Sequence, residues 1–376
     1  MTIGLMGFEF ESANKGCEAL SYSFLEVLLK KYDEEKLKIY VFSNQQLGCV
    51  KELYPNLNIT HIYLKIKDIK FTMIKALLKC DCVYDVTMGD SFSDIYSEEV
   101  CLSNMRFKMM AEIFAKRYIL LPQTYGPFYS KKVLRIAKKI LKKADKIYCR
   151  DKKSQEYIKD RCGISNAEVT TDLAFLLPYD KEMYSIESNK IKLGINVSGL
   201  LWNGGFTKNN QFGLKTNYSD YIKSLLEYYS KQPNVMVYLI PHVIDRKKDA
   251  YDDDYNVCEE ISRELKNVIL APVFKTPIEA KSYISNMDVF VGARMHSTIA
   301  AFSSGVLTIP FSYSRKFEGL YESLEYPYVI SGKKMTTEEA VIQTCKFIEC
   351  ENDLRNQQNR SMKNIEEKMM SFQRMI

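Results

Sequence analysis

Short apolar runs alternate with longer helix-forming segments along most of this chain. Runs such as Ile3 to Met6, Tyr118 to Pro122 and Val289 to Val291 have the length of buried strands and are bounded by glycine or polar residues. The segments between the runs carry apolar residues at helical spacing, as in KKVLRIAKKILKKADK. A repeated strand-then-helix order predicts parallel sheets with crossover helices, so the fold class is α/β.

The alternation forms two series, which the polar stretch PYDKEMYSIESN at 178–189 separates. A chain of 376 residues also exceeds the size at which one hydrophobic core keeps growing. We therefore predict two Rossmann-like domains, at 1–178 and 190–376, the second with a helical tail that begins near Thr336. Ligands bind at the carboxyl edge of open α/β sheets, and these two edges are expected to face each other across a cleft.

The composition is that of an ordinary globular protein, with 46% hydrophobic and 27% charged residues. No apolar run reaches the length of a membrane span and no basic leader precedes the first strand, which favours a cytoplasmic location. The ten cysteines are scattered without the spacing of a zinc site, so reduced thiols and no metal are expected.

A net charge of +6 is spread over helix faces and suggests no nucleic-acid partner. The basic stretch at 131–146 is most simply a surface helix, with peripheral contact at the inner face of the membrane as the second interpretation. The oligomeric state cannot be read from the sequence.

The stretch DVFVGARMHSTIAAFSSGVLTIPFSYSRKFEGL, at 288–320, concentrates the residues most suited to chemistry. Its first strand leads to Arg294 and His296 at the mouth of a helix, and its second strand leads to Tyr313 and Lys316. A guanidinium beside the N–H groups of a helix N-terminus is suited to hold phosphate or carboxylate. Imidazole transfers protons near neutral pH, so the pattern predicts an anion site with an acid–base group.

Other polar residues also follow apolar strands directly. They include Asp90, Gln123, Arg150, Asp172, Asn196 and His242. Each by itself is also an ordinary turn-former or helix cap. No P-loop, dinucleotide fingerprint, H-E-x-x-H or G-x-S-x-G motif occurs in the sequence. The run from Asp252 to Asp254 is interpreted as a solvated acidic face rather than a metal site.

The stretch from Gly292 to Leu320 resembles the C-terminal signature of polysaccharide pyruvyl transferases, with its R-x-H-s element and a Tyr and Lys beyond the next strand. Further pieces fall in the family's order: NKGCEAL near the start, MGDSFSDIY at 88–96, LLPQTYGPF at 120–128, YCRDKKSQEYIKDRCGI followed by TTDLAFLLP, and LIPHV at 239–243. The resemblance covers about residues 1–325. Two departures concern the acceptor side: Met88 precedes Gly89 where many relatives have two glycines, and Cys17 stands where an acidic residue is frequent.

The resemblance implies a GT-B-like architecture and transfer of a pyruvyl group from phosphoenolpyruvate to a sugar of a cell-surface polysaccharide or its precursor, usually as a ketal. The first domain would be the acceptor side and the second the phosphoenolpyruvate side, with no cofactor beyond the donor substrate. His296 is the candidate general acid, and Asp90 or Asp94 the candidate base. The candidate substrate-binding residues are Arg294, Arg150, Lys316, His242, Tyr313, Gln123 and Asn14.

Two alternatives remain open at this point. A GT-B glycosyltransferase that uses a nucleotide sugar would need an acidic residue near the nucleotide, and Glu279 and Glu318 are available. A non-catalytic glycan-assembly protein could keep the same fold, because fold alone does not fix function. The acceptor sugar, its linkage and its carrier cannot be read from the sequence.

Overall fold

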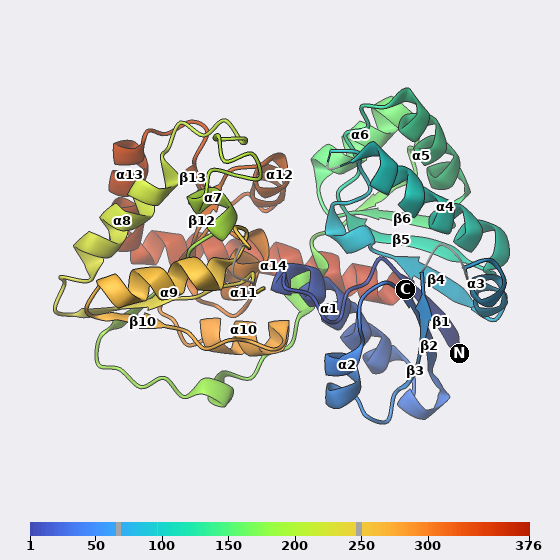
Figure 1. The fold of residues 1–376 in the computed structure, drawn as a ribbon, viewed down its shortest axis with the longest axis horizontal. Helices are drawn as coiled ribbons and strands as arrows, with labels where there is room; N and C mark the ends of the chain where they lie inside the picture. The colour runs from blue at the N-terminus through green and yellow to red at the C-terminus, as the bar shows by residue number, and fades with distance from the viewer. Residues whose placement is uncertain (65–68, 96, 246–249) are drawn as a thin grey trace. The chain divides into compact units, whose positions relative to one another are not determined.

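The computed structural model describes residues 1–64, 69–95, 97–245 and 250–376. They form two compact units, each built on a parallel sheet (Figure 1). Unit 1 comprises Met1–Ser12, Leu20–Leu173 and Lys368–Ile376, and unit 2 comprises Ala13–Ala19 and Ala174–Glu367. The predicted α/β class with two parallel sheets is confirmed.

The sheet of unit 1 has seven strands in the order β3-β2-β1-β4-β5-β6-β7, and its neighbouring strands pair in parallel. The strands are β1 (Thr2–Met6), β2 (Lys38–Ser43), β3 (Asn58–Tyr63), β4 (Cys82–Asp85), β5 (Tyr118–Gln123), β6 (Lys146–Cys149) and β7 (Glu168–Val169). The helices between them are α1 (Lys15–Lys31), α2 (Gly48–Leu53), α3 (Ile69–Leu77), α4 (Glu98–Phe114), α5 (Lys131–Lys143) and α6 (Lys152–Cys162). The order doubles back at β1, which places a switch point between β1 and β4, where ligands bind in such sheets.

The sheet of unit 2 has six strands in the order β10-β9-β8-β11-β12-β13, again with parallel neighbours. The strands are β8 (Ile191–Asn196), β9 (Val235–Leu239), β10 (Val268–Leu270), β11 (Val289–Gly292), β12 (Leu307–Ser312) and β13 (Ile330–Ser331). The helices are α7 (Gly199–Trp202), α8 (Tyr218–Tyr229), α9 (Asp254–Glu264), α10 (Pro277–Ile284), α11 (Met295–Ser303), α12 (Arg315–Ser323), α13 (Thr337–Glu349) and α14 (Glu351–Met375). Because β8, β11 and β12 are parallel neighbours, the residues that follow them gather at one edge.

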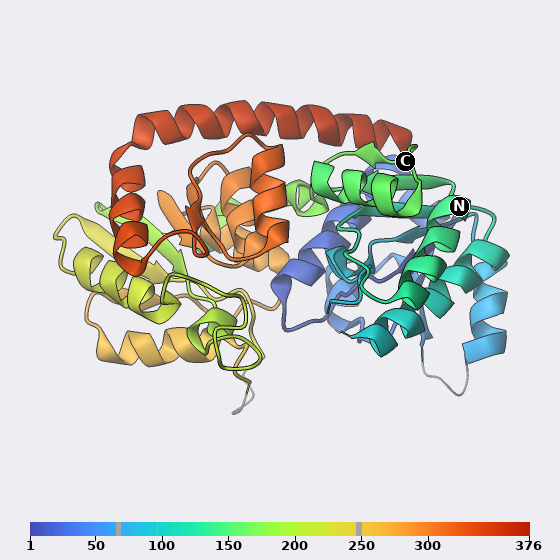
Figure 2. The same ribbon diagram turned by 90° about the horizontal axis from the view of Figure 1, so that it is seen from above.

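Two segments belong to a different unit from their neighbours in sequence. Residues 13–19, including the first turn of α1, pack within unit 2, whereas the rest of α1 belongs to unit 1. Helix α14 is one unbroken helix (Figure 2). Its Gln358 side chain donates to the carbonyls of Phe302 and Val306 in unit 2, and near its end Phe372 packs on Tyr148 in unit 1. The structural division thus assigns these segments differently from the continuous ranges 1–178 and 190–376.

Most of the predicted elements agree with the structure. The apolar run from Cys82 to Met88 predicts a strand of that length, but β4 ends at Asp85. Thr87 and Met88 have φ values of 44° and 52°, which a strand cannot contain. The helices α2, α7 and α12 and the short strand β13 were not predicted. The sequence also predicts a helix from about Lys67, and the start of that helix lies outside the described residues.

The basic stretch forms helix α5, as predicted. Ser130 caps its N-terminus by accepting from the N–H of Val133, and Val133, Ala137 and Ile140 are buried on its apolar side. Of the helices that the structure describes, none has the length and apolar character needed to cross a bilayer.

Candidate active site

Arg294 lies at the junction between β11 and α11, where it is the residue before the first helical turn. Its backbone is extended, and its N–H donates to Asn196 Oδ1 at the end of β8 (2.9 Å). The Ser297 hydroxyl donates to the same Asn196 oxygen (3.1 Å) and to the Arg294 carbonyl (2.8 Å). These bonds fix Arg294 and the following residues at the carboxyl edge of the sheet, as the sequence pattern predicted.

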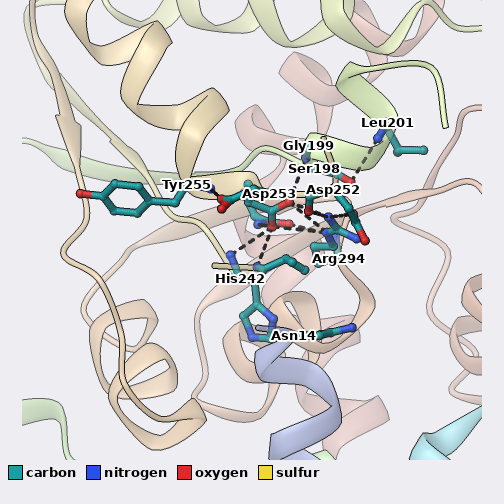
Figure 3. Close-up of polar contacts among 12 residues, drawn as sticks. Asn14, Ser198, Gly199, Leu201, His242, Asp252, Asp253, Tyr255 and Arg294 are labelled. Atoms are coloured by element: carbon teal, nitrogen blue, oxygen red, sulfur yellow. Dashed lines mark hydrogen bonds and ion pairs between the residues drawn. The ribbon is translucent and has the colours of Figure 1, made fainter. Parts of the chain in front are cut away.

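Two carboxylates hold the Arg294 guanidinium (Figure 3). Nε and Nη2 donate to Asp254 at 3.1 and 2.7 Å, and Nη2 also donates to Asp252 at 2.5 Å. Burial by itself lowers the pKa of Arg294, but the charges of Asp254 and Asp252 outweigh it and raise that pKa, so the guanidinium stays charged. Nη1 makes no such bond with the residues that the structure describes.

The interpretation of residues 252–254 as a solvated acidic face was wrong. Asp253 and Asp254 are 1% and 0% exposed. Asp253 caps α9 by accepting from the backbone N–H of the two residues that follow Asp254. Asp254 accepts from the backbone N–H groups of Gly199 (2.8 Å), His242 (3.1 Å) and Val243 (3.0 Å), in addition to Arg294. One buried carboxylate therefore joins the ends of β8, β9 and β11.

His242 is 2% exposed, and its ring extends toward the start of α1, where Asn14 lies (Figure 3). Its Nδ1 has no hydrogen-bond partner among the residues that the structure describes. Burial, followed by the positive charges of His296, Arg294 and Lys15, holds the pKa of His242 well below its usual value. His242 is therefore a neutral imidazole at neutral pH, able to offer one nitrogen to a ligand.

The segment that precedes and begins α1 packs directly on this site. Asn14 forms a β-bridge with Val243, and the Lys15 N–H donates to the His242 carbonyl (3.1 Å). The Lys15 ammonium is buried and bonds both oxygens of Glu18 (3.0 Å each). These contacts direct the N-terminus of α1 toward the two histidines, which adds a second helix end to that of α11.

Gly16 lies against His296. A Cβ atom added to Gly16 would be 2.3 Å from Nδ1 of the imidazole and 2.9 Å from its Cβ. Contacts this short do not occur, so any side chain at this position displaces the ring. Glycine here is required by close approach, and the backbone of α1 limits where the His296 ring can lie.

Gly16→Ala should therefore lower activity without touching the chemistry of any side chain. We expect a loss of about 100-fold in kcat/KM, the size of effect that a misplaced catalytic group causes. Helix propensity favours alanine and offsets part of the cost of this close contact, and circular dichroism at the assay temperature checks that the variant is folded. Gly48→Ala is the matched control: Gly48 also lies in a first helical turn, and its added Cβ would meet only the carboxylate of Glu11, at 3.1 Å. Equal activity of the two variants would show that His296 tolerates displacement.

The end of β12 contributes the next group of predicted residues. Tyr313 is buried and packs on Phe212 and Phe317. Its electrostatic interaction with Arg294 contributes to the raised pKa of that guanidinium. Lys316 lies in the first turn of α12. Of the ten predicted site residues, unit 2 contains Asn14, His242, Arg294, His296, Tyr313 and Lys316.

The other four predicted residues belong to unit 1, at or after the ends of β4, β5 and β6. Arg150 is 1% exposed and is paired with Asp172 (3.0 Å), while its Nη2 has no partner within the described residues. Gln123 is buried and donates to the carbonyl of Asp85 (3.0 Å). Asp90 follows the turn at Thr87–Gly89.

Asp94 has a structural task. Its carboxylate accepts from the backbone N–H groups of Tyr129 (2.9 Å) and Ser130 (2.8 Å), just before α5. A carboxylate engaged in this way holds the loop in place. The role of Asp90 or Asp94 as a base remains a prediction.

Sequence reasoning missed several residues of the site. Asp254 contacts Arg294 across 40 positions, and Lys15 and Gly16 contact the histidines across more than 200. The only signal available for Asp254 was its place before an apolar-periodic helix, which is also the signal of an ordinary cap.

Comparisons with known proteins support a family assignment. A sequence model of the polysaccharide pyruvyl transferase family matches residues 14–315, most of the chain. No curated protein matches the chain.

Similar solved structures include a UDP-GlcNAc 2-epimerase from Neisseria meningitidis bound to UDP-GlcNAc, with TM-score 0.59, 12% identity, and coverage of 99% of this chain and 100% of the other. They also include Anabaena Alr3699/HepE in complex with UDP and glucose, with TM-score 0.57, 11% identity and 99% coverage of both chains. A glycosyltransferase from Rickettsia africae has TM-score 0.55 and 11% identity, covering 97% of this chain and 94% of its own. At these identities the likeness shows a shared fold, that of GT-B glycosyltransferases and related epimerases. The match over residues 14–315, which includes the Arg294 and His296 element, shows that the chain is a transferase and belongs to the polysaccharide pyruvyl transferase family.

Proposed function

We propose that this enzyme transfers the pyruvyl group of phosphoenolpyruvate to a sugar of a cell-surface polysaccharide or its precursor, forms a ketal and releases phosphate. The observation that carries the proposal is the grouping of Arg294, His296 and neutral His242 with the N-termini of α1 and α11 in one unit. This grouping offers a guanidinium N–H, backbone donors and a proton-transfer group in the same place.

The site suits a small polyanion. Phosphoenolpyruvate carries a carboxylate and a phosphate, and Nη1 of Arg294 together with the N-terminus of α11, which has no side-chain cap, provides directed donors for such groups. Asp252 and Asp254 hold the guanidinium in one orientation. The fork is therefore preorganised before the ligand arrives, which reduces the entropy lost on binding.

The reaction can be written with balanced protons and bonds. His296 in its protonated form gives a proton to the methylene carbon, which becomes a methyl group, and positive charge develops on the adjacent carbon. A sugar hydroxyl attacks that carbon and its proton returns to the enzyme base. The C–O bond to phosphate then breaks, a second hydroxyl closes the ketal, and its proton leaves with the phosphate. His242, as a neutral imidazole, would orient a reactant by a hydrogen bond rather than supply charge.

Arg294→Lys tests the anion-binding part. Lysine keeps a positive charge but cannot bond Asp252, Asp254 and a ligand at once, because its ammonium lacks the planar fork. We expect the KM for phosphoenolpyruvate to rise by about tenfold or more while folding is retained. Lys316→Arg is the reverse replacement, arginine for lysine, at another positively charged residue of unit 2. An unchanged KM for the Arg294 variant would count against its role in donor binding.

The reaction class is tested by ligand-induced stabilisation and phosphate release with purified full-length enzyme. Stabilisation by phosphoenolpyruvate supports the proposal, stabilisation by UDP supports a nucleotide-sugar glycosyltransferase, and stabilisation by neither supports a non-catalytic glycan-assembly protein. Mass spectrometry of the surface glycan from a deletion strain would then identify the product, since a lost pyruvate ketal reveals the acceptor sugar.

A further inference from the structure

A pocket of about 190 Å³ opens at the carboxyl edge of the sheet in unit 1, beside the switch point between β1 and β4. It is lined by the residues that follow β1, β2, β3 and β4 and by one side of α4. The polar lining side chains are Glu9, Ser43, Asn44, Gln45, Thr87, Asn104 and Lys108, and the aromatic ones are Phe8, Phe42 and Phe107. None of the residues assigned to donor binding lines this pocket.

Glu9 is the acidic group of the pocket. Burial raises the pKa of its carboxyl, while hydrogen bonds from the side chains of Ser12 and Gln45 act in the opposite direction. Its backbone N–H is bonded to the hydroxyl of Ser21 (2.9 Å), which fixes the residue in place. A held carboxyl beside side-chain amides offers several hydrogen-bond acceptors and donors within one ligand's reach.

The floor of the pocket is strained backbone. Thr87 and Met88 are consecutive residues with positive φ, a conformation that costs on the order of 1–3 kcal/mol per residue. Met88 N–H donates to the Gly7 carbonyl (2.9 Å), and a Cβ at Gly7 would lie 2.6 Å from Thr87 N, so only glycine fits opposite the turn.

A buried network of charged and polar side chains around Asp85 holds the turn at Thr87 and Met88 in place. Asp85 accepts from both the N–H (2.9 Å) and the hydroxyl (2.6 Å) of Thr87, and it also accepts from Lys108 (2.5 Å) and Tyr118 (2.6 Å). Strain that is held by so many bonds next to a cavity is typical of a binding site. Because the Lys108 charge is neutralised by Asp85, it is not available to attract an anion.

We infer that this pocket binds one neutral sugar ring of the acceptor, with Glu9 accepting hydrogen bonds from its hydroxyls; the acceptor role, unlike the binding, rests on the proposed function. The volume of about 190 Å³ is sufficient for one ring. The carboxyl disfavours an anionic ligand, and the aromatic side chains suit the apolar C–H face of a sugar. The pocket therefore determines which sugar is accepted.

The test uses full-length enzyme and a panel of methyl glycosides of glucose, galactose, mannose, N-acetylglucosamine and N-acetylmannosamine, with binding followed by saturation-transfer NMR. Glu9→Gln removes the charge, Asn104→Trp fills the pocket, and Glu99→Gln, an exposed residue of the same helix α4 as Asn104, is the control. We expect at least one glycoside to bind wild type and Glu99→Gln equally, with affinity reduced at least tenfold in Glu9→Gln and lost in Asn104→Trp. Stabilisation by phosphoenolpyruvate should stay unchanged in all three variants.

Two results would overturn the inference: no glycoside of the panel binds the wild-type enzyme, or binding survives in both pocket variants. Failure of the proposed function looks different. In that case phosphoenolpyruvate neither stabilises the enzyme nor releases phosphate, while a glycoside still binds in a Glu9-dependent way.

Discussion

Replacing His296 by alanine is expected to abolish release of phosphate from phosphoenolpyruvate, with a loss of about 1,000-fold or more. Proton transfer by a positioned side chain raises the rate of enzyme reactions by about 10²–10⁴-fold. In the proposed reaction, protonation of the methylene carbon is the first step, and every later step depends on it. His296 lies in the first turn of α11, against Gly16. The backbone of Gly16 thus restricts where the ring can lie, which suits a proton donor.

The measurement compares phosphate release at saturating phosphoenolpyruvate with folding followed by circular dichroism. His296→Asn keeps a polar side chain of similar reach and should be as inactive as the alanine variant, since neither transfers a proton. Ser303→Ala, in the last turn of the same helix, controls for disturbance of α11. Activity of His296→Ala within threefold of wild type would remove the residue from the chemistry.

The arrangement of strands and helices was predictable because each buried strand and each amphipathic helix has a local pattern. The same pattern placed Arg294 and His296 after β11, and Tyr313 after β12, at one sheet edge. Parallel neighbours bring their ends together whatever the loops contain, so this part of the site follows from topology.

The partners of these residues were not predictable, because they depend on contacts between distant parts of the sequence. Lys15 and Glu18 resemble a common surface ion pair on a helix, yet they are 6% and 1% exposed because residues 13–19 pack within unit 2. No local signal distinguishes a buried pair at this spacing from a solvated one. The turn at Thr87 and Met88 could not be predicted either, because a threonine after an apolar run predicts that the strand continues.

Asp254 shows how a tertiary contact changes the meaning of a sequence pattern. Within a run of three aspartates it suggests solvation, whereas in the structure it is the carboxylate that neutralises Arg294 and binds three backbone N–H groups. The geometry proposed for donor binding therefore depends on a residue that need not touch the donor.

Asp254→Ala is expected to destabilise unit 2 by about 3–5 kcal/mol, the cost of leaving a buried charge without its partner. Arg294 is 9% exposed, so water cannot replace the missing carboxylate, and Asp252 alone bonds only Nη2. Asp254→Asn should cost less, because its amide oxygen still accepts backbone N–H groups, but it should cost more than a surface change.

Urea unfolding followed by tryptophan fluorescence measures this directly, because Trp202 is the only tryptophan of the chain and belongs to unit 2. It lies at the end of α7, whose first residue, Gly199, donates to Asp254. Asp220→Ala is the matched control: Asp220 is an exposed aspartate in the first turn of α8, and its loss should cost less than about 1 kcal/mol. If the midpoint of Asp254→Ala equals that of Asp220→Ala, then Arg294 does not depend on this carboxylate, and its guanidinium would not be fixed in place before a ligand binds.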